Sequence, residues 1–346
     1  MQALILAGGK GTRLRPLTVY TPKPVVPVMN RPFLLFQLEL LSRAGIKDIT
    51  FSLSYQPGKI EDLMGDGSEF GVDLHFVTEP HPMGTGGAYK YAANPNGGST
   101  VVFNGDILTD IDLAKLIARH KERKAEATIV LTRVEDPSRF GLVETDGDGR
   151  VLRFLEKPSA EQIAETGINT INAGIYILEP SILDLIPANE NRSFEYDVFP
   201  KILAEGRNFD AYIMDGDYWR DFGNPTSYLE AHHDFLAGKI KGFTLPPNGS
   251  YDIATSANVD NTSLIGEGCV IKSGSTIKNS VIGAGVHIEE KVKIENSVIW
   301  SHSRISAHAE INGAVLGRSC IIGDSSKLTH GTVLGDKALI PDYSKL

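Results

Sequence analysis

The segment LILAGGKGTRLRPLTVYTPKP, residues Leu4–Pro24, contains the strongest structural signal in the chain. Its first four residues are apolar and have the composition of a parallel strand that is buried on both faces. The strand leads at once into a loop that contains Gly8, Gly9 and Gly11. Glycines let a backbone approach a ligand closely and present its N–H groups, so the segment predicts a binding loop after the first strand.

Basic side chains accompany this loop. Lys10, Arg13 and Arg15 bring positive charge to the turn, and Lys23 lies between two prolines that fix the direction of the chain. Positive charge beside exposed N–H groups suits phosphate. The glycine spacing matches neither the dinucleotide fingerprint nor the Walker motif, so a glycine turn with solvated basic residues is the alternative for this loop taken alone.

Length and composition narrow the classes of protein. A chain of 346 residues exceeds the size at which one core keeps growing, which predicts two domains. A net charge of −9 argues against nonspecific nucleic-acid binding and against an anionic membrane surface. Cys269 and Cys320 indicate neither a disulfide framework nor a cysteine metal site. No apolar run approaches the ~20 residues of a membrane span, so we expect a cytoplasmic protein.

Strands and helices alternate after the loop. The apolar spacing predicts helices over 33–44, 84–93 and 113–124 and strands over 49–53, 74–77, 100–103 and 127–134. This alternation predicts a Rossmann-like α/β fold, with a mostly parallel mixed sheet and helices on both faces. Ligands bind such sheets outside the carboxyl ends of the strands, where the glycine loop and Asp106 fall.

The next hundred residues no longer show this regular alternation of strands and helices. A hairpin is predicted around residues 146–149, followed by a strand over 171–177 and helices near 182–186 and over 225–236. We expect this part to supply a second wall to the same site.

An internal repeat follows residues 239–258, which are rich in Gly, Pro, Ser and Asn and predict a linker. Aliphatic residues then recur at spacings of six, six and five. They are Ile265, Ile271, Ile277, Ile282, Ile288, Ile294, Ile299, Ile305, Ile311, Leu316, Ile322, Leu328 and Leu334. The pattern predicts a short left-handed parallel β-helix over 259–346, of about five coils, as a second domain beside a first over 1–238.

Two aspartates are candidate metal ligands. Asp106 follows the strand over 100–103, and Asp221 follows Trp219-Arg220. A catalytic Mg²⁺ commonly takes one or two carboxylates together with substrate phosphates and waters. Each aspartate taken singly could be a turn or cap residue, because Asn104-Gly105-Asp106 is good turn chemistry by itself.

The block GGKGTRLRPLT…PKP, joined by Asp106, the Glu156-Lys157-Pro158 motif and Asn172, resembles the sugar-1-phosphate nucleotidyltransferases, or nucleoside-diphosphate-sugar pyrophosphorylases. The resemblance implies that Arg13, Lys23, Asp106 and Asp221 are catalytic and that the two aspartates bind Mg²⁺. It implies sugar phosphate contacts from Gly141, Glu156, Lys157 and Asn172. It implies nucleotide contacts from Leu6, Ala7, Gly8, Gly9, Gly11, Thr12, Arg13, Glu79, Gly84 and Thr85.

Glu79 is the residue predicted to recognise the base. It falls where relatives place a glutamine or glutamate against the base edge. Guanine presents two adjacent N–H donors that a carboxylate accepts together, whereas adenine and thymine present mixed edges that suit an amide. Glu79 therefore favours GTP, with an ordinary exposed loop acid as the alternative.

The stretches over 134–158 and 169–180 most resemble mannose-1-phosphate guanylyltransferases, which also carry a hexapeptide tail. This implies synthesis of GDP-mannose from GTP and mannose 1-phosphate; thymidylyl, uridylyl or adenylyl transfer to glucose 1-phosphate is the alternative. Expected partners are small substrates only, without nucleic acid or membrane, and a homo-oligomer formed through the β-helix.

Two other classes of function stay open. One is a noncatalytic regulatory subunit, which would be expected to lack some of the four catalytic residue types that this chain has. The other is a bifunctional enzyme whose β-helix transfers an acyl group with a histidine such as His287, His302, His308 or His330. A histidine in a hexapeptide turn is more often a surface residue.

Overall fold

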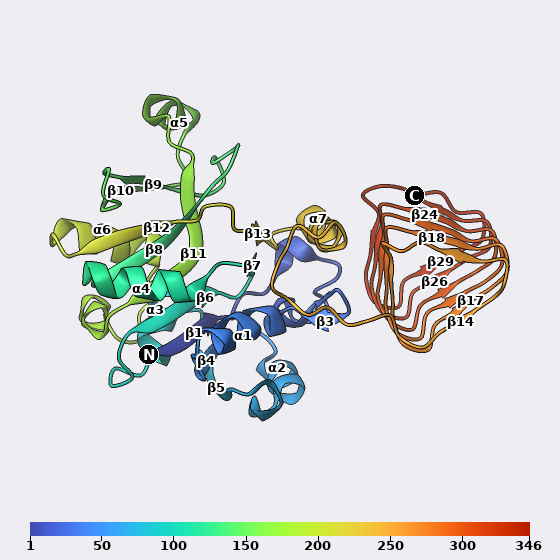
Figure 1. The fold of residues 1–346 in the computed structure, drawn as a ribbon, viewed down its shortest axis with the longest axis horizontal. Helices are drawn as coiled ribbons and strands as arrows, with labels where there is room; N and C mark the ends of the chain where they lie inside the picture. Colours follow the sequence, from blue (N-terminus) through green and yellow to red (C-terminus); the bar gives the residue numbers. More distant parts are fainter. The chain divides into compact units, whose positions relative to one another are not determined.

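The computed structural model describes residues 1–346 and divides the chain into two compact units (Figure 1). The first unit contains Met1–Gly9 and Gln37–Trp219. The second contains Lys10–Phe36 and Arg220–Leu346. The boundary between the units therefore falls within the glycine loop, and its basic part belongs to the same unit as the C-terminal repeat.

A nine-stranded mixed sheet forms the centre of the first unit. Its main path is β10 (Val151–Glu156), β9 (Gly141–Thr145), β11 (Thr170–Leu178), β6 (Thr100–Asn104), β1 (Gln2–Leu6), β4 (Asp48–Leu53) and β5 (Asp73–Thr78), while β8 (Ala127–Arg133) joins β11 to β12 (Phe209–Ile213). Strands β6, β1, β4 and β5 are parallel, whereas β11 is antiparallel to both β6 and β8. This confirms the predicted mixed, largely parallel sheet.

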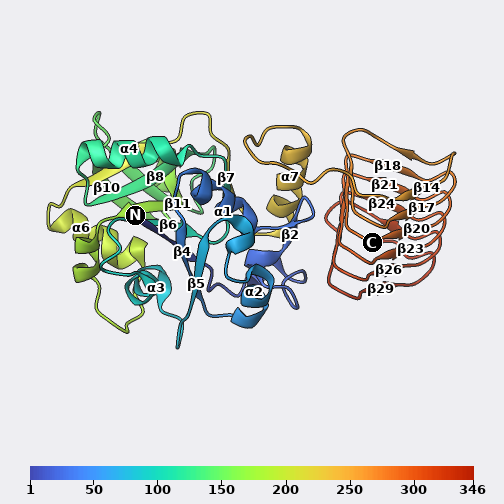
Figure 2. The ribbon, with the colours of Figure 1, turned by 60° about the horizontal axis from the view of Figure 1, so that its bottom comes forward.

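Helices cover both faces of this sheet, as Figure 2 shows. On one face, Leu4, Val102 and Ile129 belong to a buried cluster with Tyr89 of α3 and Phe199 of α6. Thr128 points to the opposite face, because successive strand residues alternate. There its Oγ1 lies 2.7 Å from Nδ1 of His120, which is on α4.

The helices of the chain agree with the sequence where the apolar pattern is long. They are α1 (Leu34–Arg43), α2 (Pro57–Met64), α3 (Gly84–Ala92), α4 (Leu113–Arg123), α5 (Ala160–Thr166), α6 (Phe199–Ala204) and α7 (Pro225–Leu236). The predicted helix near 182–186 is a 3-10 helix over Pro180–Leu185. The sequence missed α2, α5 and α6, because helices of eight residues or fewer show little periodicity. None of the helices combines the length and apolar composition needed to cross a membrane.

Short strands in three parallel sheets form the β-helix of the second unit. The first sheet contains β14 (Asp252–Ile253), β17 (Val270–Ile271), β20 (His287–Ile288), β23 (Arg304–Ile305), β26 (Ile321–Ile322) and β29 (Leu339–Ile340). The second contains β15 (Asn258–Val259), β18 (Thr276–Lys278), β21 (Lys293–Glu295), β24 (Glu310–Asn312) and β27 (Lys327–Leu328). The third contains β16 (Leu264–Ile265), β19 (Val281–Ile282), β22 (Val298–Ile299), β25 (Val315–Leu316) and β28 (Val333–Leu334).

The repeat observed in the sequence builds the interior of this β-helix. Ile265 pairs with Ile282, which pairs with Ile299, so aliphatic side chains stack from coil to coil. These residues belong to one buried cluster, which also contains Cys269 and Cys320 as free thiols. Strand β14 already pairs with β17 at Asp252, inside the stretch that the sequence analysis gives as a linker.

Four short elements complete the N-terminal part of the second unit. They are the 3-10 helices η1 (Thr12–Leu14) and η2 (Lys23–Val25) and the hairpin strands β2 (Pro27–Val28) and β3 (Arg31–Pro32). Residues Met29 and Asn30 form the hairpin turn with φ angles of 47° and 61°. Positive φ at both central residues is typical of the tight turn that matches strand twist.

Candidate active site

The carboxyl end of β1 is where the first unit gathers predicted site residues. Leu6 is in register with Asn104 of β6 on one side and with Ser52 of β4 on the other. The amide of Gly105 donates a hydrogen bond of 2.9 Å to the carbonyl oxygen of Leu6. A Cβ added to Gly105 would lie only 2.7 Å from that oxygen. The glycine therefore allows the turn that holds Asp106 to pack against Leu6 and Ala7.

Glu79 lies beside Gly8 at the same edge. A Cβ added to Gly8 would be 2.8 Å from Oε1 of Glu79 and 3.0 Å from Oγ of Ser54. The Glu79 carboxylate accepts hydrogen bonds from the Ser52 hydroxyl at 2.9 Å and from the Met83 amide at 3.2 Å. Glu79 is half-buried and held in place, so it is not an ordinary exposed loop acid.

Gly84 and Thr85, also predicted to contact the nucleotide, pack against a later part of the chain. The amides of Gly86 and Gly87 both donate to the carbonyl oxygen of Arg192, at 2.8 and 3.0 Å. The Thr85 hydroxyl donates to Glu195 at 3.1 Å and accepts from the amide of Phe194 at 2.9 Å. The close packing of this later segment therefore accounts for the glycines of the stretch without a bound ligand.

Asn172 lies in a polar network where β11 passes the end of β6. Its side-chain amide donates to the hydroxyl of Tyr176 at 2.9 Å and its Oδ1 accepts from the amide of Gly174 at 2.9 Å. The pairing of β11 with β8 shifts register between Asn172 and Tyr176. Gly174 has a φ of 73°, and a Cβ there would be 2.8 Å from Nδ2 of Asn104. The irregularity turns the Asn172 amide toward this edge of the sheet.

Gly141 and Glu156 are directly paired across β9 and β10. A Cβ on Gly141 would lie 2.7 Å from Oε2 of Glu156, so the glycine leaves room for that carboxylate. Burial raises the pKa of Glu156, and the negative charge of Glu195 raises it further. Lys157 is exposed, with a left-handed φ of 48° that turns the chain after β10. Gly141 and Glu156 thus lie side by side on neighbouring strands, and Lys157 follows directly.

The second unit contains the basic half of the predicted loop. Gly11 has a φ of 60°, and a Cβ there would lie 2.9 Å from Cβ of Lys23. The Thr18 hydroxyl donates to the Gly11 carbonyl oxygen at 2.7 Å. The glycine conformation therefore brings Lys23 against the loop, while the side chains of Thr12 and Arg13 are exposed.

Asp221 and Arg13 lie beside the same glycine. A Cβ on Gly223 would be 2.6 Å from Oδ1 of Asp221 and 3.2 Å from Nη1 of Arg13. Asp221 is half-buried, and its carbonyl oxygen accepts a hydrogen bond of 2.5 Å from the Ser227 hydroxyl at the start of α7. The structure brings together no cluster of three or more His, Cys, Asp or Glu residues that could hold a metal. Asp106, in the first unit, and Asp221, in the second, are each half-buried carboxylates, a ligand type that suits Mg²⁺, which needs few protein oxygens and keeps several waters.

The predicted site residues are thus divided between the two units. The first unit contains Leu6, Ala7, Gly8, Gly9, Glu79, Gly84, Thr85, Asp106, Gly141, Glu156, Lys157 and Asn172. The second unit contains Gly11, Thr12, Arg13, Lys23 and Asp221. Within the first unit, strand register brings Leu6, Asp106 and Asn172 to one edge of the sheet.

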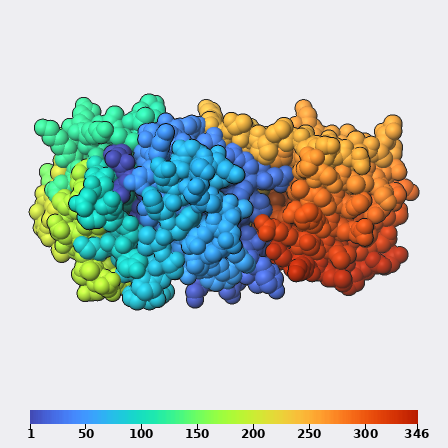
Figure 3. All heavy atoms as spheres, turned by 90° about the horizontal axis from the view of Figure 1, so that it is seen from below, coloured from blue at the N-terminus to red at the C-terminus, as the bar shows by residue number.

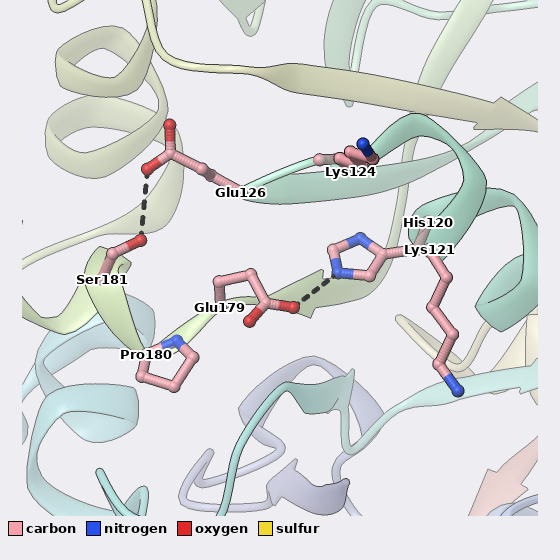
Figure 4. Close-up of a pocket in the computed structure, with 8 residues that line it drawn as sticks. His120, Lys121, Lys124, Glu126, Glu179, Pro180 and Ser181 are labelled. Atoms are coloured by element: carbon pink, nitrogen blue, oxygen red, sulfur yellow. Dashed lines mark hydrogen bonds and ion pairs between the residues drawn. The ribbon is translucent and has the colours of Figure 1, made fainter.

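A surface pocket of about 500 Å³ lies at the opposite edge of that sheet. Figure 4 shows His120 with its Nε2 3.0 Å from Glu179, and Ser181 donating to Glu126 at 3.2 Å. Glu179 follows Leu178, which pairs with Thr100 at the start of β6. None of the predicted site residues lines this pocket.

Three polar residues near the candidate site were missed by the sequence reasoning. Asn104 and Tyr176 belong to the network around Asn172, and Glu195 contacts Thr85 and raises the pKa of Glu156. Asn104 was noted only as a turn residue. A tyrosine inside an apolar strand and an acid after Phe194 give no local signal, because their role depends on which strands are neighbours.

Comparisons with known proteins agree with this architecture. Residues 2–238 match the nucleotidyl transferase family, and residues 248–346 match the left-handed β-helix (LbH) domain of EIF2B subunit epsilon. These matches confirm the predicted fold, including the left-handed β-helix. The crystal structure of HddC from Yersinia pseudotuberculosis superposes with a TM-score of 0.57 at 33% identity, covering 68% of this chain and 99% of that one.

Two relatives differ in the substrates that their names give. Mannose-1-phosphate guanylyltransferase of Mycobacterium tuberculosis is 39% identical over 279 residues, which cover 80% of this chain and 76% of that protein. UTP–glucose-1-phosphate uridylyltransferase of Synechocystis is 37% identical over 295 residues, which cover 80% and 74%. Both relatives are named as nucleotidyltransferases that act on a sugar 1-phosphate, but their names give different substrates, mannose 1-phosphate for one and UTP with glucose 1-phosphate for the other.

Proposed function

Because this chain belongs to the nucleotidyl transferase family, we propose that it condenses mannose 1-phosphate with GTP to give GDP-mannose and pyrophosphate. The observation that carries the proposal is the carboxyl end of the parallel strands, where Leu6 ends β1, Asp106 follows β6, and Asn172 lies on β11, which pairs with β6. A phosphate-binding loop, a carboxylate and a sugar-binding amide at one edge suit a reaction between a nucleoside triphosphate and a sugar phosphate.

The proposed reaction is one in-line displacement. A phosphate oxygen of the sugar 1-phosphate attacks the α-phosphorus of the nucleotide, and the bond from that phosphorus to the bridging oxygen of pyrophosphate breaks. No residue needs to form a covalent bond with substrate. Catalysis then consists of positioning the two substrates and neutralising the charge that develops on the leaving pyrophosphate.

The loop after β1 is proposed to bind the triphosphate. Its backbone amides from Gly8 to Thr12, together with the exposed guanidinium of Arg13, would supply donors for phosphate oxygens, whereas the Ala7 amide donates to the Ser52 carbonyl oxygen at 2.9 Å. Lys23 is held against Gly11 and is proposed to reach the reacting phosphates. These groups would stabilise pyrophosphate as it departs.

The opposite substrate is proposed to lie along β9, β10 and β11. Glu156 and Asn172 would accept and donate hydrogen bonds with sugar hydroxyls, and the Gly141 backbone would contact the hexose. Lys157 directly follows Glu156 and would hold the sugar phosphate. The raised pKa of Glu156 means that burial and Glu195 disfavour its charged form, which sugar hydroxyl donors would offset.

A divalent cation, proposed to be Mg²⁺, would be held by Asp106 and Asp221 and would neutralise triphosphate charge when bound. Family members generally require such a metal. Both carboxylates are half-buried, Asp106 in the turn after β6 and Asp221 as the last residue of β13 (Trp219–Asp221), which suits a cation that also takes phosphate oxygens and water. The side chains of this protein position the substrates around that charge.

The choice of GTP depends on Glu79. Its two oxygens accept from Ser52 and Met83, and each keeps a further lone pair for the adjacent N–H donors of guanine. A second candidate is uridylyl transfer to glucose 1-phosphate, which the similarity to the Synechocystis enzyme favours. A noncatalytic subunit is disfavoured because Arg13, Lys23, Asp106 and Asp221 are all present.

The decisive experiment measures pyrophosphate release with GTP, UTP, ATP and dTTP, each combined with mannose 1-phosphate and glucose 1-phosphate, with Mg²⁺ and with EDTA. We expect the highest kcat/KM for GTP with mannose 1-phosphate, and no turnover in EDTA. Preference for UTP and glucose 1-phosphate would replace the substrate pair while keeping the reaction. No release with any pair would reject the enzyme itself.

Two variants sharpen this test. Asp106→Ala should abolish turnover and leave the melting temperature close to that of the wild type, since the side chain is half-buried at a strand end. Near-normal activity in this variant would reject Asp106 as a metal ligand. Glu79→Gln should lower kcat/KM for GTP by roughly tenfold, the cost of weakening one charge-assisted contact. Unchanged preference for GTP would remove Glu79 from base recognition.

A further inference from the structure

The predicted triphosphate-binding segment belongs to the same compact unit as the β-helix. Residues Lys10–Phe36 and the repeat within Arg220–Leu346 form one unit of the chain. In Figure 3 the blue N-terminal segment meets the red last coils, where a Cβ on Gly335 would lie 3.1 Å from Cβ of Pro16. The β-helix thus contacts the segment that contains Arg13 and Lys23.

Tyr228, on α7, connects the β-helix to this segment. Its hydroxyl accepts a hydrogen bond of 2.9 Å from Nε1 of Trp300, and it donates a short hydrogen bond to the carbonyl oxygen of Pro27. Trp300 and Tyr228 are 2% and 0% exposed, so water cannot replace either bond. Pro27 follows η2, in which the Val26 amide donates to the carbonyl oxygen of Lys23 at 3.3 Å.

The same tyrosine also packs against Phe222, which directly follows the proposed metal ligand Asp221. The ring of Phe222 lies 6.0 Å from that of Tyr228 in an edge-on arrangement and 4.5 Å from that of Phe33. Phe222 is fully buried and directly follows Asp221. One buried ring system therefore supports both Asp221 and the strands after Lys23.

A second hydrogen bond fixes the hairpin to the β-helix. Nδ2 of Asn30, in the turn between β2 and β3, donates to the carbonyl oxygen of Ile282 at 2.9 Å. Ile282 belongs to β19, and Trp300 follows the next strand of the same sheet, β22. The hairpin is therefore held at its turn by Asn30 and at its first strand by Tyr228.

From this geometry we propose that Trp300 and Tyr228 are positioning residues for the reaction, through which the β-helix orders the segment that contains Lys23. The inference rests on the proposed function, since it gives Lys23 and Asp221 their roles. Removing the Trp300 N–H leaves the Tyr228 hydroxyl without its buried donor. Removing the Tyr228 hydroxyl leaves the Pro27 carbonyl oxygen without its buried donor. The η2 segment then moves more freely, and Lys23 is displaced from the reacting phosphates.

The test compares Tyr228→Phe and Trp300→Phe with the wild-type chain. Both variants keep an aromatic ring and lose one hydrogen-bonding group. We expect kcat to fall roughly tenfold to a hundredfold, the cost of misplacing a group near the reacting atoms. Amide hydrogen exchange should rise about fivefold across residues 23–33 and stay at the wild-type rate in β1 and β6. Tyr343→Phe is the matched control, because Tyr343 is 74% exposed on the last coil.

The activity is measured with the substrate pair that the wild type prefers. Wild-type kcat, or a raised KM with kcat unchanged, would overturn the proposal, because Lys23 acts on the reacting phosphates. Exchange rates that remain at the wild-type value in residues 23–33 would overturn it as well. If the wild type releases no pyrophosphate with any pair, the proposed function fails, and the exchange rates alone decide whether the β-helix orders this segment.

Discussion

Two glycine-rich stretches, residues 8–11 and 84–87, differ in what lies against their glycines. A Cβ added to Gly9 would meet no atom within 4 Å, and the three atoms nearest to one on Gly8 belong to the side chains of Glu79 and Ser54. A Cβ added to Gly87 would lie 2.3 Å from the carbonyl oxygen of Glu190. The first stretch is open on one side, whereas the second is closed by the chain itself.

A glycine-rich stretch indicates that another group packs closely against its backbone. It does not indicate whether that group is a ligand or another segment of the chain. In the second stretch the approaching group is the backbone over residues 190–193, in which the carbonyl oxygen of Arg192 accepts from the amides of both Gly86 and Gly87. In the first stretch the space beside Gly9 remains available to a ligand. Substitutions in the first should therefore act on catalysis, and substitutions in the second should act on folding.

Arg13→Ala, two residues after the first stretch, should have the largest effect. The guanidinium is exposed, so its loss should leave the melting temperature within about one degree of the wild type. Loss of a charged donor to the departing pyrophosphate should lower kcat/KM by about 10² to 10³. Arg304→Ala, which removes an exposed arginine from the β-helix, is the control and should retain full activity. Activity above a tenth of wild type would show that the loop does not bind the triphosphate through Arg13.

Gly87→Ala should have the next largest effect, on stability. The added methyl group would contact a backbone carbonyl that cannot turn away, and overpacking of this kind costs about 3 kcal/mol. Urea unfolding measures the loss. Gly58→Ala is the matched control, because Gly58 lies in helix α2 with no atom within 4 Å of an added Cβ. That variant should gain about 0.5 kcal/mol. Equal midpoints for both variants would refute the close approach at Gly87.

Much of this architecture could be predicted because its signals are local. The alternating strands and helices from 4 to 134 and the aliphatic repeat from 265 to 334 each repeat a short pattern, and the structure has both. Asp106 was predicted at the end of its strand for the same reason. The close packing of the Glu190 backbone against Gly87 could not be predicted, because the two residues are about a hundred positions apart. Nothing in the local sequence of either segment indicates that they are neighbours.

The same reason explains the attachment of the loop to the β-helix. Trp300 looks like any apolar residue of the repeat, and Tyr228 looks like a buried position on a helix. Their hydrogen bond depends on α7 packing on the third sheet of the β-helix, which no local pattern encodes. Long-range polar contacts between segments of different periodicity were the part of the site that sequence reasoning missed.

Gly9→Ala tests whether the open backbone of the first stretch takes part in substrate binding. The structure accommodates the methyl group, and Gly9 has no positive φ angle, so the free energy of unfolding should change by less than about 0.5 kcal/mol. If phosphate approaches this backbone, the methyl group should lower kcat/KM by about tenfold, chiefly through the KM for the nucleotide. Wild-type kinetics in Gly9→Ala would show that the triphosphate does not bind against the Gly9 backbone. Ligand binding would then not account for the open space beside Gly9.

Thr85→Val should have the smallest effect and separates two roles of the second stretch. The Thr85 hydroxyl bridges Glu195 and the amide of Phe194, so its removal should cost about 1 kcal/mol of stability. Because the hydroxyl is engaged within the chain, the KM for the nucleotide should stay at the wild-type value, even if the backbone of Gly84 and Thr85 lies against the nucleoside as the family resemblance implies. Thr109→Val is a control for loss of a buried threonine hydroxyl, since Thr109 donates to the carbonyl oxygen of Tyr218 at 2.7 Å. A raised KM for the nucleotide in Thr85→Val with unchanged stability would indicate that residues 84–87 bind the ligand. The proposed difference between a ligand-binding first stretch and a structural second stretch would then be wrong.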